Sequence, residues 1–193
     1  QLGGKNMWTS VNDYKQFANT FYSWTRDFSS VVYDGTHSDK RSDLITYQSY
    51  NEFSRGINSI PSSDANYTDN YKHIRRTNLL LQNAEAYAKP EDIKQYIGEA
   101  YFFRAYSYFD LLQLYGDVII TKKPLDITDP EMKVKRNDRS EVVDLIIDDL
   151  NHAVENLPAF KELTTEEEGR ISKEGAQAFL SRVALYEGTW QKS

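Results

Sequence analysis

Aromatic and polar residues suited to contact a sugar lie between residues 34 and 71. A sugar ring presents C–H bonds to an aromatic face and hydroxyl groups at its edge, so a carbohydrate site combines a tyrosine or tryptophan with nearby asparagine, aspartate or arginine. Tyr67 and Asn70 have this composition, and Tyr47 and Tyr50 are further candidates in the same stretch. The alternative is that Tyr67 only packs against the helix that follows, and the sequence favours neither interpretation.

Residues for catalysis do not form a recognisable reactive set. A glycosidase needs two carboxylates roughly 5 to 10 Å apart across a cleft. Asp144, Asp148 and Asp149 instead fall on one expected helix beside a solvated face, and the glutamates at 166–168 fall in a loop. The chain contains no cysteine, which excludes thiolate metal sites and cysteine nucleophiles within it. We therefore predict that the protein is not an enzyme.

Metal-ligating residues are dispersed along the sequence. His37, His73 and His152 are far apart and lie in no HExxH pattern, so we expect ordinary surface or capping histidines. DANYTDN at residues 64–70 has oxygen ligands at alternate positions. It lacks the glycine and the terminal glutamate of a calcium loop, which leaves calcium as a lesser alternative. We predict no metal site and no cofactor.

The charge balance opposes a role in nucleic-acid binding. The 193 residues carry a formal net charge of -6 with a pI near 5.1, whereas phosphate binding needs a concentrated basic face. The densest basic cluster, KHIRR at residues 72–76, is typical of a solvated helix face. No apolar run approaches the roughly 20 residues of a membrane-spanning helix. A hydrophobic content of 39% indicates a chain that folds.

The elements that position these residues are expected to be helices. Residues 9–28 predict a first helix capped by Ser10, and residues 31–66 form a long irregular stretch. Helical spacing and cap residues then delimit helices over residues 70–88, 91–115, 139–157 and 173–187. We predict an all-α fold with two regions. An amino-terminal helix and long loop occupy residues 1–69, and tetratricopeptide-like helical repeats occupy residues 70–193.

The repeat assignment rests on two similar helix pairs. A constant offset aligns Ala100 with Ala176 in the second helix of each pair, and Ile74 matches Val143 in the first. Small residues one turn from large apolar ones let antiparallel helices approach closely, as in tetratricopeptide-type repeats. We therefore expect both alanines to occupy equivalent buried contacts between helices.

The helix over residues 91–115 is apolar on nearly every side and carries Arg104 among its aromatic residues. An inner helix of a stack is covered by its partner and by the next pair, so these aromatic residues are expected in the core. A buried arginine must be paired. Glu99, or an acid from another helix such as Asp149, would serve as its partner. We expect Arg104 to belong to the scaffold rather than to a ligand site.

Four segments, in this order and spacing, resemble the amino-terminal half of SusD/RagB-type outer-membrane proteins of the Bacteroidetes. They are YKHIRRTNLLLQNA, IGEAYFFRAYSYFDLLQLYGDVII, RNDRSEVVDLIIDDLNHAVENLP and GRISKEGAQAFLSRVALYEG. The residues of the second segment that match the family pattern are Glu99, Ala100, Arg104, Ala105, Leu114, Tyr115 and Gly116. SDKRSDL at residues 38–44 also resembles a family feature, which adds Arg41 to the expected glycan-binding residues.

The resemblance implies a non-catalytic lipoprotein at the outer-membrane surface that holds an oligosaccharide over a TonB-dependent transporter. Starch-type members place an aromatic residue three positions before an asparagine ahead of the first repeat helix, and Tyr67 and Asn70 match this pattern. Membrane attachment is expected only through a lipid anchor not present in this chain. One alternative is a repeat scaffold that binds a peptide or a protein. Another is an enzyme whose active site lies in the carboxy-terminal part of the family, which is absent here.

Overall fold

The protein is helical in the part of the chain that the computed structural model describes, namely residues 7–25, 56, 59, 61–125, 129–130 and 134–188. The α-helices are α1 (Val11–Asn19), α4 (Ala65–Glu85), α5 (Lys94–Tyr115), α6 (Arg139–Asn156) and α7 (Lys173–Glu187). Short 3-10 helices are η1 (Thr20–Trp24), η3 (Pro90–Ile93), η5 (Phe160–Glu162) and η6 (Thr165–Glu167). Over these same residues the only strand-like pairing is an isolated bridge between Val118 and Asn137. The predicted all-α fold class is confirmed.

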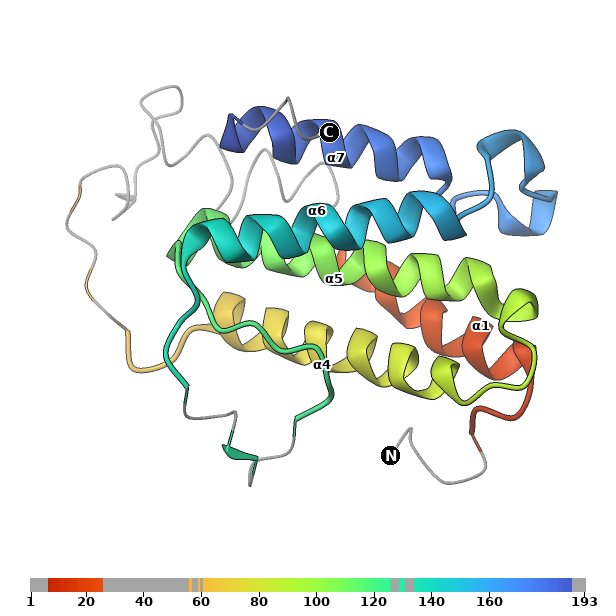
Figure 1. Cartoon of the computed structure of the whole chain (residues 1–193), viewed down its shortest axis with the longest axis horizontal. Coiled ribbons are helices and arrows are strands. Elements are labelled where there is room, and N and C mark those ends of the chain that lie inside the picture. The colour runs from red at the N-terminus through yellow and green to blue at the C-terminus, as the bar shows by residue number, and fades with distance from the viewer. Residues whose placement is uncertain are drawn as a thin grey trace, which may run out of the picture. The chain divides into compact units, whose positions relative to one another are not determined.

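The four long helices form an antiparallel stack. α5 packs against both α4 and α6, and α7 packs on α6, as Figure 1 shows. α1 also contacts α4 and α5, and residues 1–22 and 65–193 form one compact unit. Residues 23–64 form a second unit, few of whose residues are described. Consecutive helices of the first unit alternate in direction, which is the arrangement expected of tetratricopeptide-like helix pairs.

Local capping signals place several helix ends where the sequence predicts them. The Ser10 hydroxyl accepts a hydrogen bond from the Asp13 N–H at 3.3 Å, and the Asp13 carboxylate accepts one from the Ser10 N–H at 2.8 Å. Ser172 caps α7 by accepting from the Gly175 N–H at 3.3 Å. Gly188 ends that helix with a φ of 65°, in the left-handed region that favours glycine.

The start of α4 differs from the predicted one. The helix begins at Ala65 rather than at Asn70, so the predicted boundary between residues 69 and 70 falls inside it. The polar residues of this stretch favour turns in isolation, but the Asn70 amide donates to the Asn66 carbonyl oxygen at 2.9 Å, within the helix. Packing of α4 against α5 overrides the local preference. The first helix is shorter than predicted, because η1 replaces its last turns from Thr20.

α5 is covered on nearly every side, in agreement with its composition. The Phe103 ring centroid lies 5.7 Å from that of Phe21 in η1, and the Phe102 centroid lies 5.5 Å from that of Phe179 in α7. A Cβ atom added at Gly98 would lie 2.9 Å from the Leu157 side chain, so α5 approaches the end of α6 closely there. None of the described helices combines the length and apolarity that crossing a bilayer requires.

Equivalent positions in the two helix pairs are equally buried at the centre of the stack but differ in burial at its edge. Ala100 and Ala176 are both fully buried. Phe109 is 4% exposed because Tyr186 and a second aromatic residue of α7 cover it. Leu185, its counterpart by the same offset, is 76% exposed. Near the end of α7, Leu185 is therefore an apolar side chain that no other described residue covers.

Enlarging Ala100 tests the close packing of the helix pairs. Ala100→Leu should lower the free energy of unfolding by about 1 to 3 kcal/mol, because the larger side chain has no room between α5 and its neighbours. Urea unfolding followed by circular dichroism measures the change. Ala178→Leu, at an exposed position of α7, is the control and should change stability by no more than about 0.5 kcal/mol. An Ala100→Leu protein as stable as wild type would contradict the buried contact.

Candidate ligand-binding site

Tyr67 lies in the first turn of α4, half-buried beside the end of α5. Its ring centroid is 4.8 Å from that of Tyr71, one turn further along α4. The ring of Tyr115, the last residue of α5, meets Tyr67 edge-on at 5.2 Å, with 87° between the ring planes. Because α4 and α5 are antiparallel, the start of one helix and the end of the other form a single tyrosine cluster, consisting of Tyr67, Tyr71 and Tyr115.

Tyr71 connects this cluster to the chain that follows α5. Its hydroxyl donates to the Ile119 carbonyl oxygen and accepts from the Ile119 N–H, both at 2.9 Å. Burial raises the pKa of Tyr71 far above its usual value, and the neighbouring Tyr67 side chain raises it further. The hydroxyl therefore stays protonated and keeps its proton available for Ile119. Tyr67 is thus held by a neighbour that is itself anchored.

Asn70 occupies a different environment from the one expected of an exposed ligand residue. It is 7% exposed and lies in the second turn of α4, so it is not the N-cap of that helix. Its amide donates to the Asn66 carbonyl oxygen at 2.9 Å and to the carboxylate of Asp110, a buried residue of α5, at 3.5 Å. Of the predicted pair, Tyr67 is the half-exposed member, and Asn70 lies beneath the surface.

The other predicted site residues lie outside the described part of the chain. Tyr47, Tyr50 and Arg41 all belong to the region of residues 26–55, and His37 does as well. The residues that the structure brings to Tyr67 are Tyr71 and Tyr115. Tyr115 is part of the family pattern in the sequence. It is far from Tyr67 along the chain, however, so the sequence alone does not indicate that the two rings are in contact.

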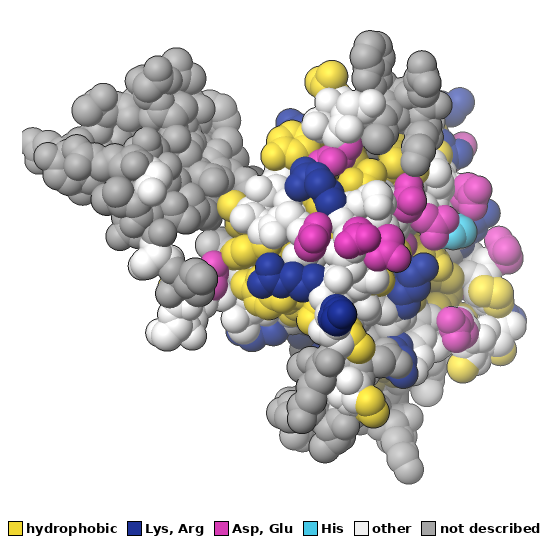
Figure 2. Space-filling model, turned by 60° about the vertical axis from the view of Figure 1, so that its left-hand side comes forward, with side chains coloured by type: hydrophobic (Ala, Val, Ile, Leu, Met, Phe, Trp, Pro, Cys, Tyr) yellow, Lys and Arg dark blue, Asp and Glu magenta, His cyan; other side chains and the backbone are white. Residues whose placement is uncertain are grey.

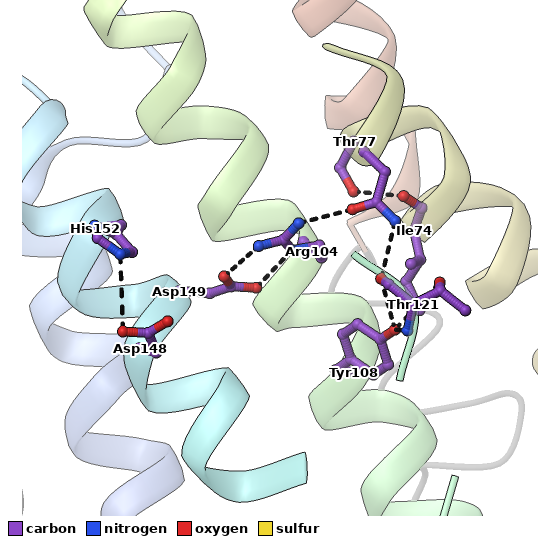
Figure 3. A network of polar contacts seen from close by, with 9 residues as sticks. Ile74, Thr77, Arg104, Tyr108, Thr121, Asp148, Asp149 and His152 are labelled. Atoms are coloured by element: carbon purple, nitrogen blue, oxygen red, sulfur yellow. Dashed lines mark hydrogen bonds and ion pairs between the residues drawn. The ribbon is translucent and has the colours of Figure 1, made fainter. Parts of the chain in front are cut away.

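A buried arginine joins three helices and the segment that follows α5 (Figure 3). Arg104 donates to both carboxylate oxygens of Asp149 on α6, at 2.8 and 2.6 Å, and to the Asn78 side-chain oxygen on α4 at 2.7 Å. Asn78 in turn donates to the backbone carbonyl oxygens of Thr121 and Lys123, at 2.9 and 3.2 Å. Burial raises the pKa of Asp149, and the bonds from Arg104 oppose that rise. The predicted burial of Arg104 and its pairing with Asp149 are confirmed.

Side chains, rather than a neighbouring strand, bind much of the backbone of the extended segment after Gly116. The Tyr108 hydroxyl accepts from the Thr121 N–H at 2.7 Å and donates to the Thr121 carbonyl oxygen at 3.2 Å. The Ile120 N–H donates to the Asn137 side chain at 2.9 Å. Backbone polar groups near a protein core need such partners. The family pattern indicates an apolar extended step here, but nothing in the sequence indicates its side-chain partners.

Two further arginine–carboxylate pairs join elements that are distant in sequence. Arg170, in the loop before α7, donates to both carboxylate oxygens of Glu99 at 2.8 Å. Arg139 at the start of α6 donates to both oxygens of Glu187 at the end of α7, at 3.0 and 2.6 Å. Burial raises the pKa of Glu99, against the effect of Arg170. Glu99, the other partner considered for Arg104, therefore binds a different arginine.

His73 and His152 lie within helices, and so does most of the acidic stretch at residues 64–70. Burial lowers the pKa of His73 to about 4. His152 lies 3.7 Å from Asp148 and 3.6 Å from Glu155, all on exposed turns of α6. Residues 64–70 enter a helix at Ala65, so they do not form the loop that the calcium alternative requires. Across the described residues, no group of three or more histidines and acids could hold a metal ion.

The surface that includes the start of α4 carries mixed charge. Figure 2 turns that side of the molecule toward the viewer and shows acidic and basic side chains interspersed, with apolar side chains between them. No continuous basic area appears among the described residues of this face. A surface of this kind lacks the concentrated positive charge that phosphate backbones require.

Comparison with known families and curated proteins gives one consistent result. A SusD-like family model, described as starch-binding and associating with the outer membrane, matches residues 5–185. SusD-like protein P38 of Formosa agariphila is 33% identical over 133 residues, which are 67% of this chain and 25% of that protein. A SusD-like protein of Bacteroides ovatus is 32% identical over 94 residues, 49% of this chain and 16% of that protein. The chain thus spans about a quarter or less of these relatives.

Solved structures show the same similarity. A SusD-like protein from Bacteroides fragilis superimposes with a TM-score of 0.80 and 27% identity, over 99% of this chain and 38% of that one. A laminarin-binding SusD-like protein gives a TM-score of 0.64 with 30% identity, over 72% of this chain and 30% of that one. The stack of helix pairs is therefore shared with proteins described as carbohydrate binders.

Removing the Arg104 charge separates its structural role from a ligand role. Arg104→Leu should lower the free energy of unfolding by about 3 to 5 kcal/mol, because Asp149 then stays buried without its partner. The double variant Arg104→Leu/Asp149→Leu should recover part of that loss in the same urea titration. Ligand affinity of the folded single variant should equal that of wild type. A stable Arg104→Leu protein with selectively weakened binding would overturn the scaffold assignment.

The lowered pKa of His73 predicts a stability that depends on pH. The unfolded chain takes up a proton near pH 6.5, whereas the folded chain does so near pH 4, so stability falls as the pH decreases through this window. For a half-buried group, solvent screening leaves about 1 to 2 kcal/mol of the effect. Urea unfolding at pH 7 and pH 4.5 should show this loss in wild type and a smaller one in His73→Gln. Equal losses in both proteins would show that His73 is not responsible.

Proposed function

This chain belongs to the SusD-like family, and on that premise we propose that it binds an oligosaccharide at the outer-membrane surface without transforming it. The family description and the carbohydrate-binding relatives support this role. We further propose that the protein is attached by a lipid anchor and that it presents its ligand to a TonB-dependent transporter. These last two roles rest on the family resemblance alone.

The observation that carries the proposal is the half-exposed ring of Tyr67 at the junction of α4 and α5. Two further tyrosines hold this ring from α4 and α5, at 4.8 and 5.2 Å. A fixed aromatic face with polar surroundings is what the C–H face of a sugar ring requires. Asn70 and Asp110 are buried, and their bond joins the two helices. Tyr47, Tyr50 and Arg41 remain proposed ligand residues.

The arrangement of carboxylates supports binding rather than hydrolysis. A glycosidase needs one carboxyl group that gives up its proton and a second that faces it across the substrate. Burial raises the pKa of both Glu99 and Asp149. Each carboxylate is bound through both of its oxygens to an arginine. Neither has an oxygen directed at a substrate. The buried acids therefore hold helices together.

The relatives suggest which sugars to test first. The family model is described as starch-binding, and one solved relative, 30% identical to this chain, is described as laminarin-binding. Both descriptions concern glucose polymers. We therefore propose glucan oligosaccharides as the ligand class, with laminarin and starch fragments as the first probes.

A protein-binding scaffold remains a second candidate, because a specific surface favours it. Leu185 is 76% exposed and Tyr186 is 53% exposed, both near the end of α7. Adjacent large apolar side chains exposed at the end of a helix are found at contacts with other protein surfaces. This surface belongs to α7, whereas Tyr67 belongs to the start of α4, so variants can test the two roles separately.

Replacing Tyr67 tests the proposed sugar contact. Tyr67→Ala should weaken binding of laminarin or starch oligosaccharides by roughly ten- to a hundredfold, because stacking on an aromatic ring contributes about 1 to 3 kcal/mol by analogy with nucleic-acid bases. Tyr67→Phe keeps the ring and should weaken binding by no more than about threefold. Isothermal titration calorimetry on the whole natural chain measures both affinities.

Stability must be measured in the same experiment, because Tyr67 also packs against its neighbours. Equal affinities of Tyr67→Ala and wild type would move the site to Tyr47, Tyr50 or a part of the protein beyond these residues. A fall in thermal stability that parallels the loss of affinity would favour the packing role. Leu185→Ser should leave sugar affinity unchanged, and it serves as the control for the α7 surface.

A further inference from the structure

We propose that Tyr71 is a positioning residue that holds the Tyr67 ring in its ligand-binding orientation by linking it to the backbone after α5. The proposal rests on the proposed function, since it concerns the same aromatic surface. It assigns to Tyr71 a role inside the protein, in contact with Tyr67 rather than with the sugar. The carrying observation is the pair of hydrogen bonds between the Tyr71 hydroxyl and Ile119.

The Tyr71 hydroxyl is held by both groups of one backbone residue. It donates to the Ile119 carbonyl oxygen and accepts from the Ile119 N–H, each at 2.9 Å. A phenol has a single proton to donate, so these two bonds fix the direction of the hydroxyl and of the ring behind it. Ile119 is 48 residues further along the chain. The Tyr71 ring is therefore anchored outside its own helix.

Tyr67 depends on this anchor through the contact between its ring and the Tyr71 ring. The two ring centroids are 4.8 Å apart, with 48° between the ring planes. Tyr115 supports the other side of Tyr67 edge-on at 5.2 Å. Loss of the Tyr71 hydroxyl removes one of these two supports and leaves the Tyr115 contact in place.

A ring that is already held in place binds more tightly than a mobile one. Immobilising a side chain on binding has an entropic cost. A side chain that is already fixed in the free protein avoids this cost when the ligand binds. If the Tyr71 hydroxyl provides this restraint, its removal should weaken sugar binding by roughly three- to tenfold. The loss should be smaller than that caused by Tyr67→Ala, because the sugar still has a ring to contact.

Tyr108 provides a matched control within the same segment. Its hydroxyl accepts from the Thr121 N–H at 2.7 Å and donates to the Thr121 carbonyl oxygen at 3.2 Å. The bonding pattern is that of Tyr71, two residues further along the same extended backbone. Tyr108 is fully buried on α5, whereas the aromatic neighbours of Tyr67 are Tyr71 and Tyr115. Removing the Tyr108 hydroxyl should therefore remove a comparable pair of backbone bonds while both bonds of Tyr71 to Ile119 remain.

The first experiment compares Tyr71→Phe with Tyr108→Phe on the whole natural chain. Both substitutions keep the ring and remove one hydroxyl, so both proteins should fold, with Tyr108→Phe losing at least as much stability in urea. Laminarin affinity, measured by calorimetry, should fall roughly three- to tenfold in Tyr71→Phe and stay at the wild-type value in Tyr108→Phe. Equal losses in the two variants, or no loss in either, would overturn the positioning role.

A second measurement follows the Tyr67 ring without any ligand. With 3-fluorotyrosine placed at position 67, the ¹⁹F resonance should shift or broaden in Tyr71→Phe and remain unchanged in Tyr108→Phe. An unchanged resonance in Tyr71→Phe would overturn the proposal even where Tyr67→Ala abolishes binding. If Tyr67→Ala instead binds laminarin as wild type does, the proposed sugar contact fails, and the ¹⁹F comparison alone decides whether Tyr71 orients Tyr67.

Discussion

The buried charge of Arg104 is the constraint on which the arrangement of this helix stack depends. A guanidinium group removed from water must be neutralised and bonded on all sides, and here the partners come from both neighbouring helices. Asp149 supplies the opposite charge from α6, and Asn78 supplies a neutral acceptor from α4. Because Asn78 also binds the backbone of Thr121, the same network fixes the chain that leaves α5. One side chain thereby sets the mutual positions of three helices and one extended segment.

Arginine–carboxylate pairs also join the outer elements of the stack. Arg170 connects the loop before α7 to Glu99 on α5, and Arg139 connects the start of α6 to Glu187 at the end of α7. Each pair is bidentate, a geometry that restricts rotation as well as distance. Apolar packing alone would allow antiparallel helices to slide by a turn, since their small and large residues recur. The charged pairs select one arrangement among these alternatives.

The candidate site is a consequence of this fixed geometry. Because α4 and α5 are antiparallel, Tyr67 at the start of one helix meets Tyr115 at the end of the other. The segment held by the Arg104 network then passes Tyr71, whose hydroxyl binds Ile119. Tyr71 in turn contacts the Tyr67 ring, whereas Arg104 itself is too buried to touch a ligand. The two hydrogen bonds between Tyr71 and Ile119 thus anchor the neighbour of the surface ring to the backbone after α5.

Local chemistry determined the helices, and long-range contacts decided the site. Capping residues such as Ser10 and Ser172 act within one turn, and the spacing of apolar residues indicates which face of a helix is buried. Helix ends and buried faces could therefore be predicted from the sequence alone. The pairing of Arg104 with Asp149 could also be anticipated, because a buried cation needs an acid and few inward-facing acids exist. The burial of Asn70 and the bonds of Tyr71 to Ile119 could not, since they depend on which turns of α4 face α5 and on where the chain runs after it. Turn-favouring residues gave no sign that α4 begins at Ala65, because the energy that makes them helical comes from packing against a helix that follows them in sequence.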